Sequence, residues 1–303
     1  MRTSLTAIAS ILSLGFAAYA MDAQLGPASA QEGGEGGVVR EIIPGHYRYE
    51  NGTRVAGIIV TDEGVVVIDG LSSPAMGRDV QQKIAEAIGQ PVRYLVSPTF
   101  HNNYTRGNAA YQDVVSIGHE LYREDLIALF EENNVPAAER AARLPDVTYR
   151  ESMTLHLGGK EIQIIHNGPA HTRGDSIVFV PEDRIVYVSE LLFYNRFPWM
   201  NSGYVGWIDA IDRVLAMDAD IFVPGQGPMT YDDPRESREA LIRFRQILVD
   251  ARDAVQREIA RGATEEEVLA TVLLPQYQDL GGYQQQREVV VRRTYLDLKG
   301  ILE

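Results

Sequence analysis

Short apolar segments that end in turn residues alternate with amphipathic segments, and this alternation constrains the fold more than any other feature of the chain. Residues 54–70 (RVAGIIVTDEGVVVIDG) have the composition of two strands joined by a tight turn. Residues 153–168 and 175–193 repeat the strand–turn–strand pattern. Residues 72–88 and 205–220 have the composition of helices. Because strands and helices alternate in two halves, the sequence predicts an α/β layered sandwich.

The last 70 or so residues are helical in character and are predicted to form a C-terminal extension, residues 233–303, packed on a main domain of residues 40–232. A helix starting at Asp233-Pro234 carries an apolar stripe made of Leu241, Phe244, Leu248, Ala251, Val255 and Ile259. Thr264 and Glu267 form a capping-box pattern for the next helix. The segment from Arg287 to Glu303 gives a final helix. A dimerisation arm is the alternative role for these helices.

The N-terminal residues have the pattern of a secretory signal peptide. Arg2 precedes an apolar run, and small-x-small cleavage sites end at Ala20 and at Ala30. We therefore predict a signal peptide over residues 1–30, a flexible Gly-rich lead-in over 31–39, and a periplasmic or secreted protein without stable membrane insertion after cleavage. An uncleaved N-terminal anchor is the alternative. The chain has no cysteine, which excludes both a lipid anchor on cysteine and disulfides.

The overall charge limits the kinds of partner. The net charge of -14 argues against a nucleic-acid partner, because nucleic-acid binding needs a basic face. A small-molecule ligand or substrate is expected instead. The sequence leaves the oligomeric state and the identity of that ligand open.

A polar stretch, Ser97 to Asn108 (SPTFHNNYTRGN), stands where a strand should give way to a helix. It resembles the metal-binding loop of the metallo-β-lactamase superfamily, His-x-His-x-Asp-His followed by a Gly-Asn element. Three further blocks occur in the order of that family: VVVIDG before the loop, and after it GPAHTRGDSIVFVPEDRIVYVSELLF and IFVPGQGPM. The resemblance implies a four-layer αβ/βα sandwich with the helical C-terminal extension, and a dinuclear zinc site in the cleft.

Most of the metal-ligand positions implied by the resemblance hold weak donors. The first-ion set becomes Thr99, His101 and His171, the second-ion set becomes Asn103, Tyr104 and Gln226, and the bridging aspartate becomes Glu190. Neutral Thr, Asn and Gln are poor zinc ligands, and a tyrosine ligates well only as a phenolate. A two-zinc centre is therefore not expected. His101, His171 and Glu190 remain as a set that could hold a single divalent ion, and zinc is the ion we expect first.

Two hypotheses of function follow. In the first, the chain is a metallo-β-lactamase-fold protein with an eroded dinuclear site, non-catalytic or ligand-binding in the remaining polar cleft. In the second, it is a hydrolase with one metal held by His101, His171 and Glu190. A metal-free cluster in which these side chains hydrogen-bond to one another and to Tyr104 is the competing state of the site. Arg106 and Trp199 are candidate ligand contacts, and the other histidines, including His46 and His156, are expected to be structural or surface residues.

Overall fold

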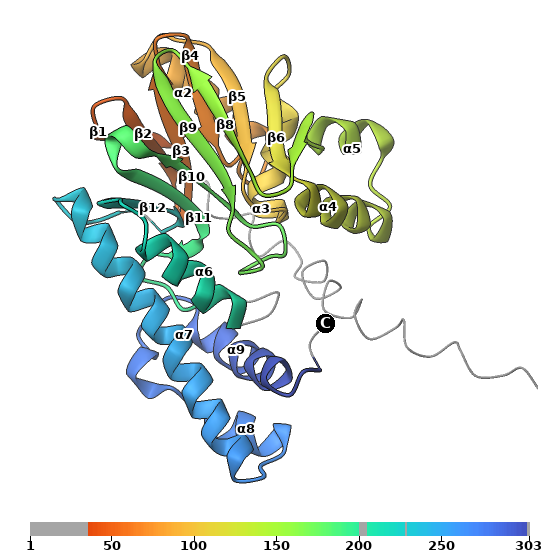
Figure 1. Ribbon diagram of the computed structural model, residues 1–303. Helices are drawn as coiled ribbons and strands as arrows, with labels where there is room; N and C mark the ends of the chain where they lie inside the picture. Colours follow the sequence, from red (N-terminus) through yellow and green to blue (C-terminus); the bar gives the residue numbers. More distant parts are fainter. Residues whose placement is uncertain (1–35, 200–204, 228, 302–303) are drawn as a thin grey trace, which may run out of the picture.

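The computed structural model describes residues 36–199, 205–227 and 229–301 (Figure 1). The predicted signal peptide and the first part of the lead-in lie outside these ranges. Within them, no helix is both long and apolar enough to cross a membrane.

The first half of the fold is a group of strands covered by one long helix. The turn predicted between residues 54 and 70 joins two antiparallel strands as expected. The helix α2 (Pro74–Ala87) begins where Ser73 accepts a hydrogen bond from the backbone N–H of Met76 at 3.2 Å. The strands of this half are β1 (Val38–Ile43), β2 (His46–Asn51), β3 (Arg54–Thr61), β4 (Gly64–Ile68), β5 (Val92–Ser97), β6 (Val115–His119) and β7 (Val147–Tyr149).

The second half contains the two predicted hairpins and a parallel strand that joins it to the first half. Its elements are β8 (Ser152–Leu157), β9 (Lys160–His166), β10 (Ser176–Val180), β11 (Ile185–Phe193), α6 (Val205–Leu215) and β12 (Ile221–Gln226). The strand order is β7-β6-β5-β4-β3-β12-β11-β10-β9-β8, with β2 and β1 following from β3. The two halves are joined where β12 meets β3, and this contact consists of one antiparallel pair, Gln226 with Arg54.

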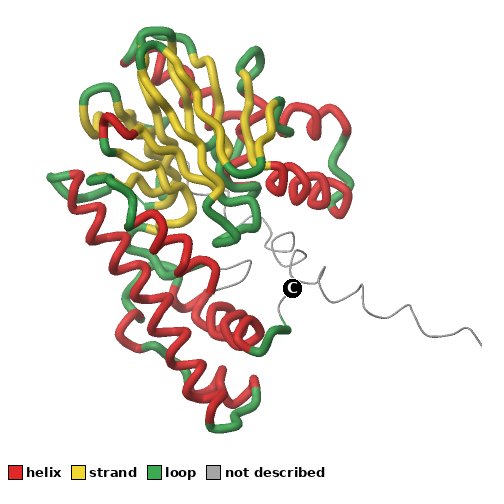
Figure 2. Tube along the Cα trace, viewed as in Figure 1, coloured by secondary structure: helices red, strands yellow, loops and turns green. Residues whose placement is uncertain are grey.

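Three apolar clusters define four layers and confirm the expected fold. Between the two halves of the sheet, Ile59, Val66 and Val96 pack on residues of β9–β12. Under α2, a second cluster covers the outer face of the first half. The largest cluster lies between the outer face of β11 and β12 and the helices α6 and α7. The order is therefore helix, sheet, sheet, helix, and Figure 2 shows the strands gathered together with the long C-terminal helices beneath them.

The C-terminal helices pack on the body of the molecule, as the apolar stripe indicates. They are α7 (Ser237–Ala260), α8 (Glu265–Thr271) and α9 (Tyr283–Leu298). The capping box of Thr264 and Glu267 is present. The first helix starts later than predicted, at Ser237, because Asp233 caps a single 3-10 turn over Pro234–Glu236. The last helix starts earlier than predicted, at Tyr283.

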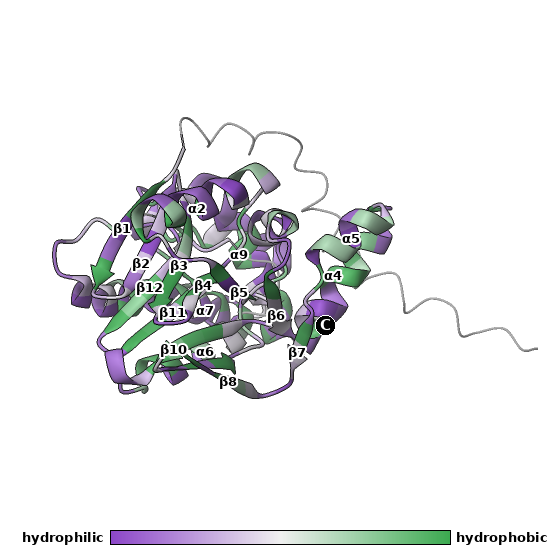
Figure 3. Ribbon diagram, turned by 90° about the horizontal axis from the view of Figure 1, so that it is seen from above, coloured by the Kyte–Doolittle hydropathy of each residue, from purple (hydrophilic) through white to green (hydrophobic). Residues whose placement is uncertain are grey.

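An insertion of two helices, α4 (Glu120–Glu132) and α5 (Ala137–Arg143), projects from the edge of the sheet (Figures 1 and 3). It has a small apolar core of its own, which includes Tyr122, Leu126 and Phe130 and which also takes in Phe100 of the polar loop. The Arg143 guanidinium donates to Asn102 Oδ1 at 2.6 Å and to Thr105 Oγ1 at 2.9 Å. The insertion therefore helps to fix the loop that carries His101.

Candidate functional site

The polar loop is held in place at the end of β5 by close backbone contacts. Asn108 Nδ2 donates to Ser97 Oγ at 3.0 Å, and the Gly107 N–H donates to Leu71 O at 2.9 Å. A Cβ on Gly107 would lie 1.7 Å from the carbonyl oxygen of Gly70, so only glycine permits this approach. The short helix α3 (Asn102–Thr105) then follows His101 directly.

His101, His171 and Glu190 come together from three separate parts of the fold. His101 Nδ1 lies 2.6 Å from Glu190 Oε2, and His171 Nε2 lies 3.5 Å from the same oxygen. All three side chains are buried, with exposures of 4%, 1% and 5%. The sequence prediction that these residues form one cluster is consistent with this geometry.

The charges of the cluster favour an ionised carboxylate. Burial alone would raise the pKa of Glu190, but the two imidazoles and their hydrogen bonds outweigh burial and hold that pKa well below its usual value. An ionised carboxylate only accepts hydrogen bonds, so His101 donates from Nδ1. Thr99 Oγ1 donates to the same Oε2 at 3.2 Å. Thr99 thus joins the cluster as a hydrogen-bond donor.

Tyr104 occupies the interior beside this cluster and is fully buried. Its hydroxyl donates to the carbonyl oxygen of Gly225 at 3.0 Å. Burial, together with the nearby charge of Glu190, raises the pKa of Tyr104 far above that of a free phenol. The hydroxyl is therefore a neutral donor already engaged with the backbone, and it would have to give up the hydrogen bond to Gly225 O before it could bind a metal ion.

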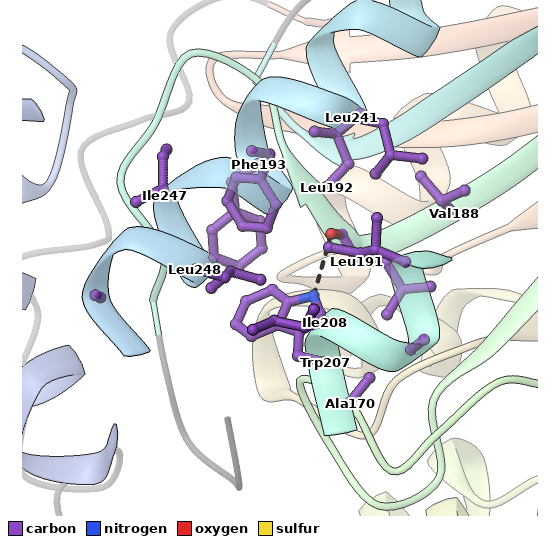
Figure 4. Packing of buried hydrophobic residues seen from close by; sticks show 14 of the residues in the cluster. Ala170, Val188, Leu191, Leu192, Phe193, Trp207, Ile208, Leu241, Ile247 and Leu248 are labelled. Carbon is purple, nitrogen blue, oxygen red and sulfur yellow. Dashed lines mark hydrogen bonds between the residues drawn. The ribbon is translucent and has the colours of Figure 1, made fainter. Parts of the chain in front are cut away.

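His171 is oriented by aromatic rings and by the loop that follows it. Its ring lies 4.8 Å from that of Trp207 and 5.3 Å from that of Phe193, measured between centroids. Thr172 donates to the Asp175 carboxylate from both its backbone N–H, at 2.7 Å, and its hydroxyl. Figure 4 shows Trp207 and Phe193 inside the large apolar cluster, with the Trp207 indole N–H bonded to Leu191 O. The imidazole of His171 is thus held against a rigid apolar wall.

Two further residues near the cluster were not identified from the sequence as part of the site. Asp69, just after β4, accepts a hydrogen bond from Ser189 Oγ at 2.7 Å. Burial raises the pKa of Asp69 well above its usual value, and the charges of Glu190 and Asp175 raise it further. Arg54 lies with its guanidinium carbon 5.5 Å from the centroid of the Tyr104 ring. Asp69 belongs to the VVVIDG block of the family resemblance, which is a usable signal in the sequence. Arg54 has no such signal, because its neighbours in space come from distant parts of the chain.

The other predicted site residues have less direct roles in the structure. Asn103 lies on α3 and is partly buried, and Gln226 is the last residue of β12, also partly buried. Arg106 is exposed at the end of α3. Trp199 packs, partly buried, against the large apolar cluster. Ligand contacts by Arg106 and Trp199 stay predictions.

The three clustered residues have the donor types of a single divalent metal site. One ligand atom from each residue lies within 4.8 Å of the others. Zinc–nitrogen and zinc–oxygen bonds of about 2.0–2.1 Å place tetrahedral donors about 3.3 Å apart. The 3.5 Å separation of His171 and Glu190 agrees with this spacing, while the 2.6 Å separation of His101 and Glu190 is shorter. The set fits one ion if His101 gives up its hydrogen bond to Glu190.

The fold and the site together define a four-layer α/β protein with a buried His–His–carboxylate cluster. A family model described as the metallo-beta-lactamase superfamily matches residues 50–226, more than half of the chain. The chain therefore belongs to the metallo-β-lactamase superfamily.

Similar proteins include lactamases and sulfatases. A metallo-beta-lactamase from Pontibacter korlensis has 22% identity, covers 71% of this chain and 99% of its own, and has a TM-score of 0.59. The inverting sec-alkylsulfatase Pisa1 from Pseudomonas sp. has 15% identity, covers 86% of this chain and 50% of its own, and has a TM-score of 0.68. At these identities the structural similarity shows the fold alone.

Two curated proteins are related in sequence. The alpha subunit of 2,4-dinitroanisole O-demethylase from Nocardioides sp. is 25% identical over 171 residues, covering 54% of this chain and 49% of its own. A linear primary-alkylsulfatase from Pseudomonas sp. is 22% identical over 272 residues, covering 75% of this chain and 51% of its own. The chain thus spans about half the length of these curated relatives.

Proposed function

We propose that the protein is a ligand-binding member of the superfamily that does not carry out dinuclear metal-dependent hydrolysis. The observation that carries this proposal is the hydrogen bond from the Tyr104 hydroxyl to Gly225 O. It places a neutral, buried phenol at a position that the family resemblance assigns to a ligand of the second ion. Asn103 and Gln226 at the two other second-ion positions are neutral amides.

The remaining cluster supports the same proposal because the Glu190 carboxylate has its partners within the cluster. Glu190 accepts from His101 and Thr99, with His171 alongside. Buried polar groups that are paired in this way need no metal to offset the cost of burial.

A mononuclear hydrolase is the second candidate, and the His101–His171–Glu190 geometry favours it. A bound divalent ion would act as a Lewis acid and lower the pKa of a water molecule. The three residues would hold that ion, and Thr99 would remain a donor to the carboxylate. A structural neighbour, the lactamase FIM-1 from Pseudomonas aeruginosa, is described in a mono-zinc form, with 17% identity and a TM-score of 0.55.

Metal analysis of the untagged protein, purified without chelating resin, separates the two candidates. The proposal expects a metal content well below one ion per chain and no hydrolysis of a lactam, a thioester, a phosphodiester or an alkyl sulfate. If the protein is a mononuclear hydrolase, we expect about one metal ion per chain and hydrolysis of at least one of these substrates. In that case the ion should be lost in His101→Ala and kept in His156→Ala, which changes an exposed histidine. That result would replace the proposal by the second candidate.

Export also belongs to the proposal. The charged Arg2, the apolar run after it and the small residues at Ala20 and Ala30 support a periplasmic or secreted location. If the protein binds its ligand outside the cytoplasm, that ligand is a molecule present in the periplasm or in the medium.

A further inference from the structure

Within the described part of the chain, Arg54 and Gln226 form the register pair between β3 and β12, where the two halves of the sheet meet. Arg54 is the first residue of β3, Gln226 is the last residue of β12, and the two are directly opposite in an antiparallel pair. Side chains that are directly opposite in such a pair lie on the same face of the sheet. The guanidinium therefore lies on the face of the sheet to which the Gln226 side chain belongs.

Tyr104 fixes where on that face the guanidinium lies. The Arg54 guanidinium carbon is 5.5 Å from the Tyr104 ring centroid, within the range of a cation–π contact. Tyr104 and Gln226 stand at two of the three positions where the family resemblance expects ligands of the second ion. Arg54 thus brings a guanidinium group to the side of the site where the family resemblance places the second cation.

The Arg54 side chain has hydrogen-bonding capacity left for a ligand. Its Nη1 atom is buried and has no hydrogen-bond acceptor among the described residues. A buried donor without an acceptor is costly, and a charged donor more so. The side chain as a whole is only partly buried, so other atoms of Arg54 reach solvent while Nη1 does not.

We propose that Arg54 replaces the second cation as an anion-binding residue, so that the ligand of the cleft carries an oxyanion group: a carboxylate, a sulfate or a phosphate. A guanidinium holds such groups through two parallel N–H···O bonds, which adds geometric selectivity to the charge. The chain as a whole has a net charge of -14, so binding an anion requires a local cationic group. This inference rests on the proposed ligand-binding function and names the class of ligand.

Thermal unfolding of the full protein in acetate, sulfate or phosphate, against sodium chloride at equal ionic strength, tests the inference. An anion that binds the folded state raises the melting temperature in a saturable way. At least one oxyanion should do so in the wild type. Arg54→Gln should weaken the apparent affinity by about tenfold or more, because a charged bidentate contact is lost. Arg54→Lys keeps the positive charge but loses the two parallel N–H donors of the guanidinium, so this variant should retain part of the binding.

Arg93→Gln is the matched control. Arg93 is an exposed arginine near the start of β5, whereas the site loop follows the end of that strand. This variant removes the same charge and should bind the oxyanion within about twofold of the wild type.

Two outcomes overturn the inference: no saturable effect of any of the three oxyanions on the wild type, or equal affinity in Arg54→Gln and the wild type. Equal affinity would leave the ligand-binding function in place. If metal analysis instead shows a mononuclear hydrolase, the proposed function fails, and the dependence of KM on Arg54 with an anionic substrate still tests the inference.

Discussion

Burial changes the acid–base behaviour of individual side chains, and His46 is a case well away from the candidate site. Its side chain is fully buried, with Nδ1 3.1 Å from the Tyr187 hydroxyl and Nε2 2.8 Å from Asp183 Oδ2. Burial is the largest effect on His46 and lowers its pKa. The hydrogen bond and charge of Asp183 oppose this only in part. Of the two other nearby charges, Lys160 lowers the pKa of His46 and Glu182 raises it. His46 is a structural residue, one of the two roles that the sequence left open for it, and the neutral imidazole is the form that the fold favours.

The lowered pKa of His46 predicts a loss of stability in mildly acidic solution. Between the folded pKa and the unfolded value of about 6.5, the unfolded chain binds the proton and the folded chain does not. The free energy of unfolding should therefore fall as the pH drops below about 6.5. His46→Gln should give a shallower fall in urea-denaturation series over the same range.

His156→Gln is the control for this pH series, because His156 is exposed. Its pH dependence should match that of the wild type. Identical slopes for His46→Gln and the wild type would contradict the assignment.

At the scale of elements, the sequence predicts helix starts well where it contains capping residues. The helix α2 and the capping box of α8 follow from such signals, since a cap satisfies backbone N–H groups within a few residues of itself. The start of α7 was wrong by three residues, because Asp233-Pro234 favours a helical turn without deciding between a 3-10 turn and an α-helix. Its apolar stripe was placed correctly.

The stripe of α7 predicts which residues carry its stability. Leu248 is fully buried in the cluster that contains Trp207 and Phe193, whose rings contact His171 (Figure 4). Leu248→Ala should lower the free energy of unfolding by about 2–5 kcal/mol, from lost burial and the cavity that remains. Ile242→Ala, on the exposed side of the same helix at 39% exposure, should stay within about 0.5 kcal/mol of the wild type. Equal losses in the two variants would mean that α7 does not pack as described.

At the scale of the whole molecule, the two halves of the sheet depend on close contacts between strands far apart in sequence. Tyr187 of β11 packs directly over Gly57 of β3 and donates to Ile58 O at 3.1 Å. The sequence indicated the two halves but not the pairing of β12 with β3, since nothing in either strand alone specifies its partner. The resemblance to a known family supplied that architecture.

The contact between the halves is predicted to tolerate no additional atom at Gly57. In Gly57→Ala the new Cβ would lie 2.3 Å from Tyr187 Cδ1, so the ring must move. Overpacking of this kind should cost about 1–3 kcal/mol of unfolding free energy in urea denaturation. Gly281→Ala is the control, because its Cβ would meet nothing nearer than Arg196 Nη1 at 3.6 Å. A stability equal to that of the control would show that the halves are loosely packed here.

The sequence by itself determined which donor types stand at the ligand positions that the family resemblance implies. The resemblance supplied the positions, and ligand chemistry, which depends on residue type, ranked His101, His171 and Glu190 above Thr99, Asn103, Tyr104 and Gln226 as donors. Only the tertiary structure decided that Tyr104 donates to Gly225 and that Arg54 lies beside it. The first contact joins residues 121 positions apart and links the two halves of the fold, and the second joins β3 to the loop that follows β5. Such contacts arise from how elements far apart in the sequence pack against one another, and the apolar pattern of one element does not specify which element is its partner.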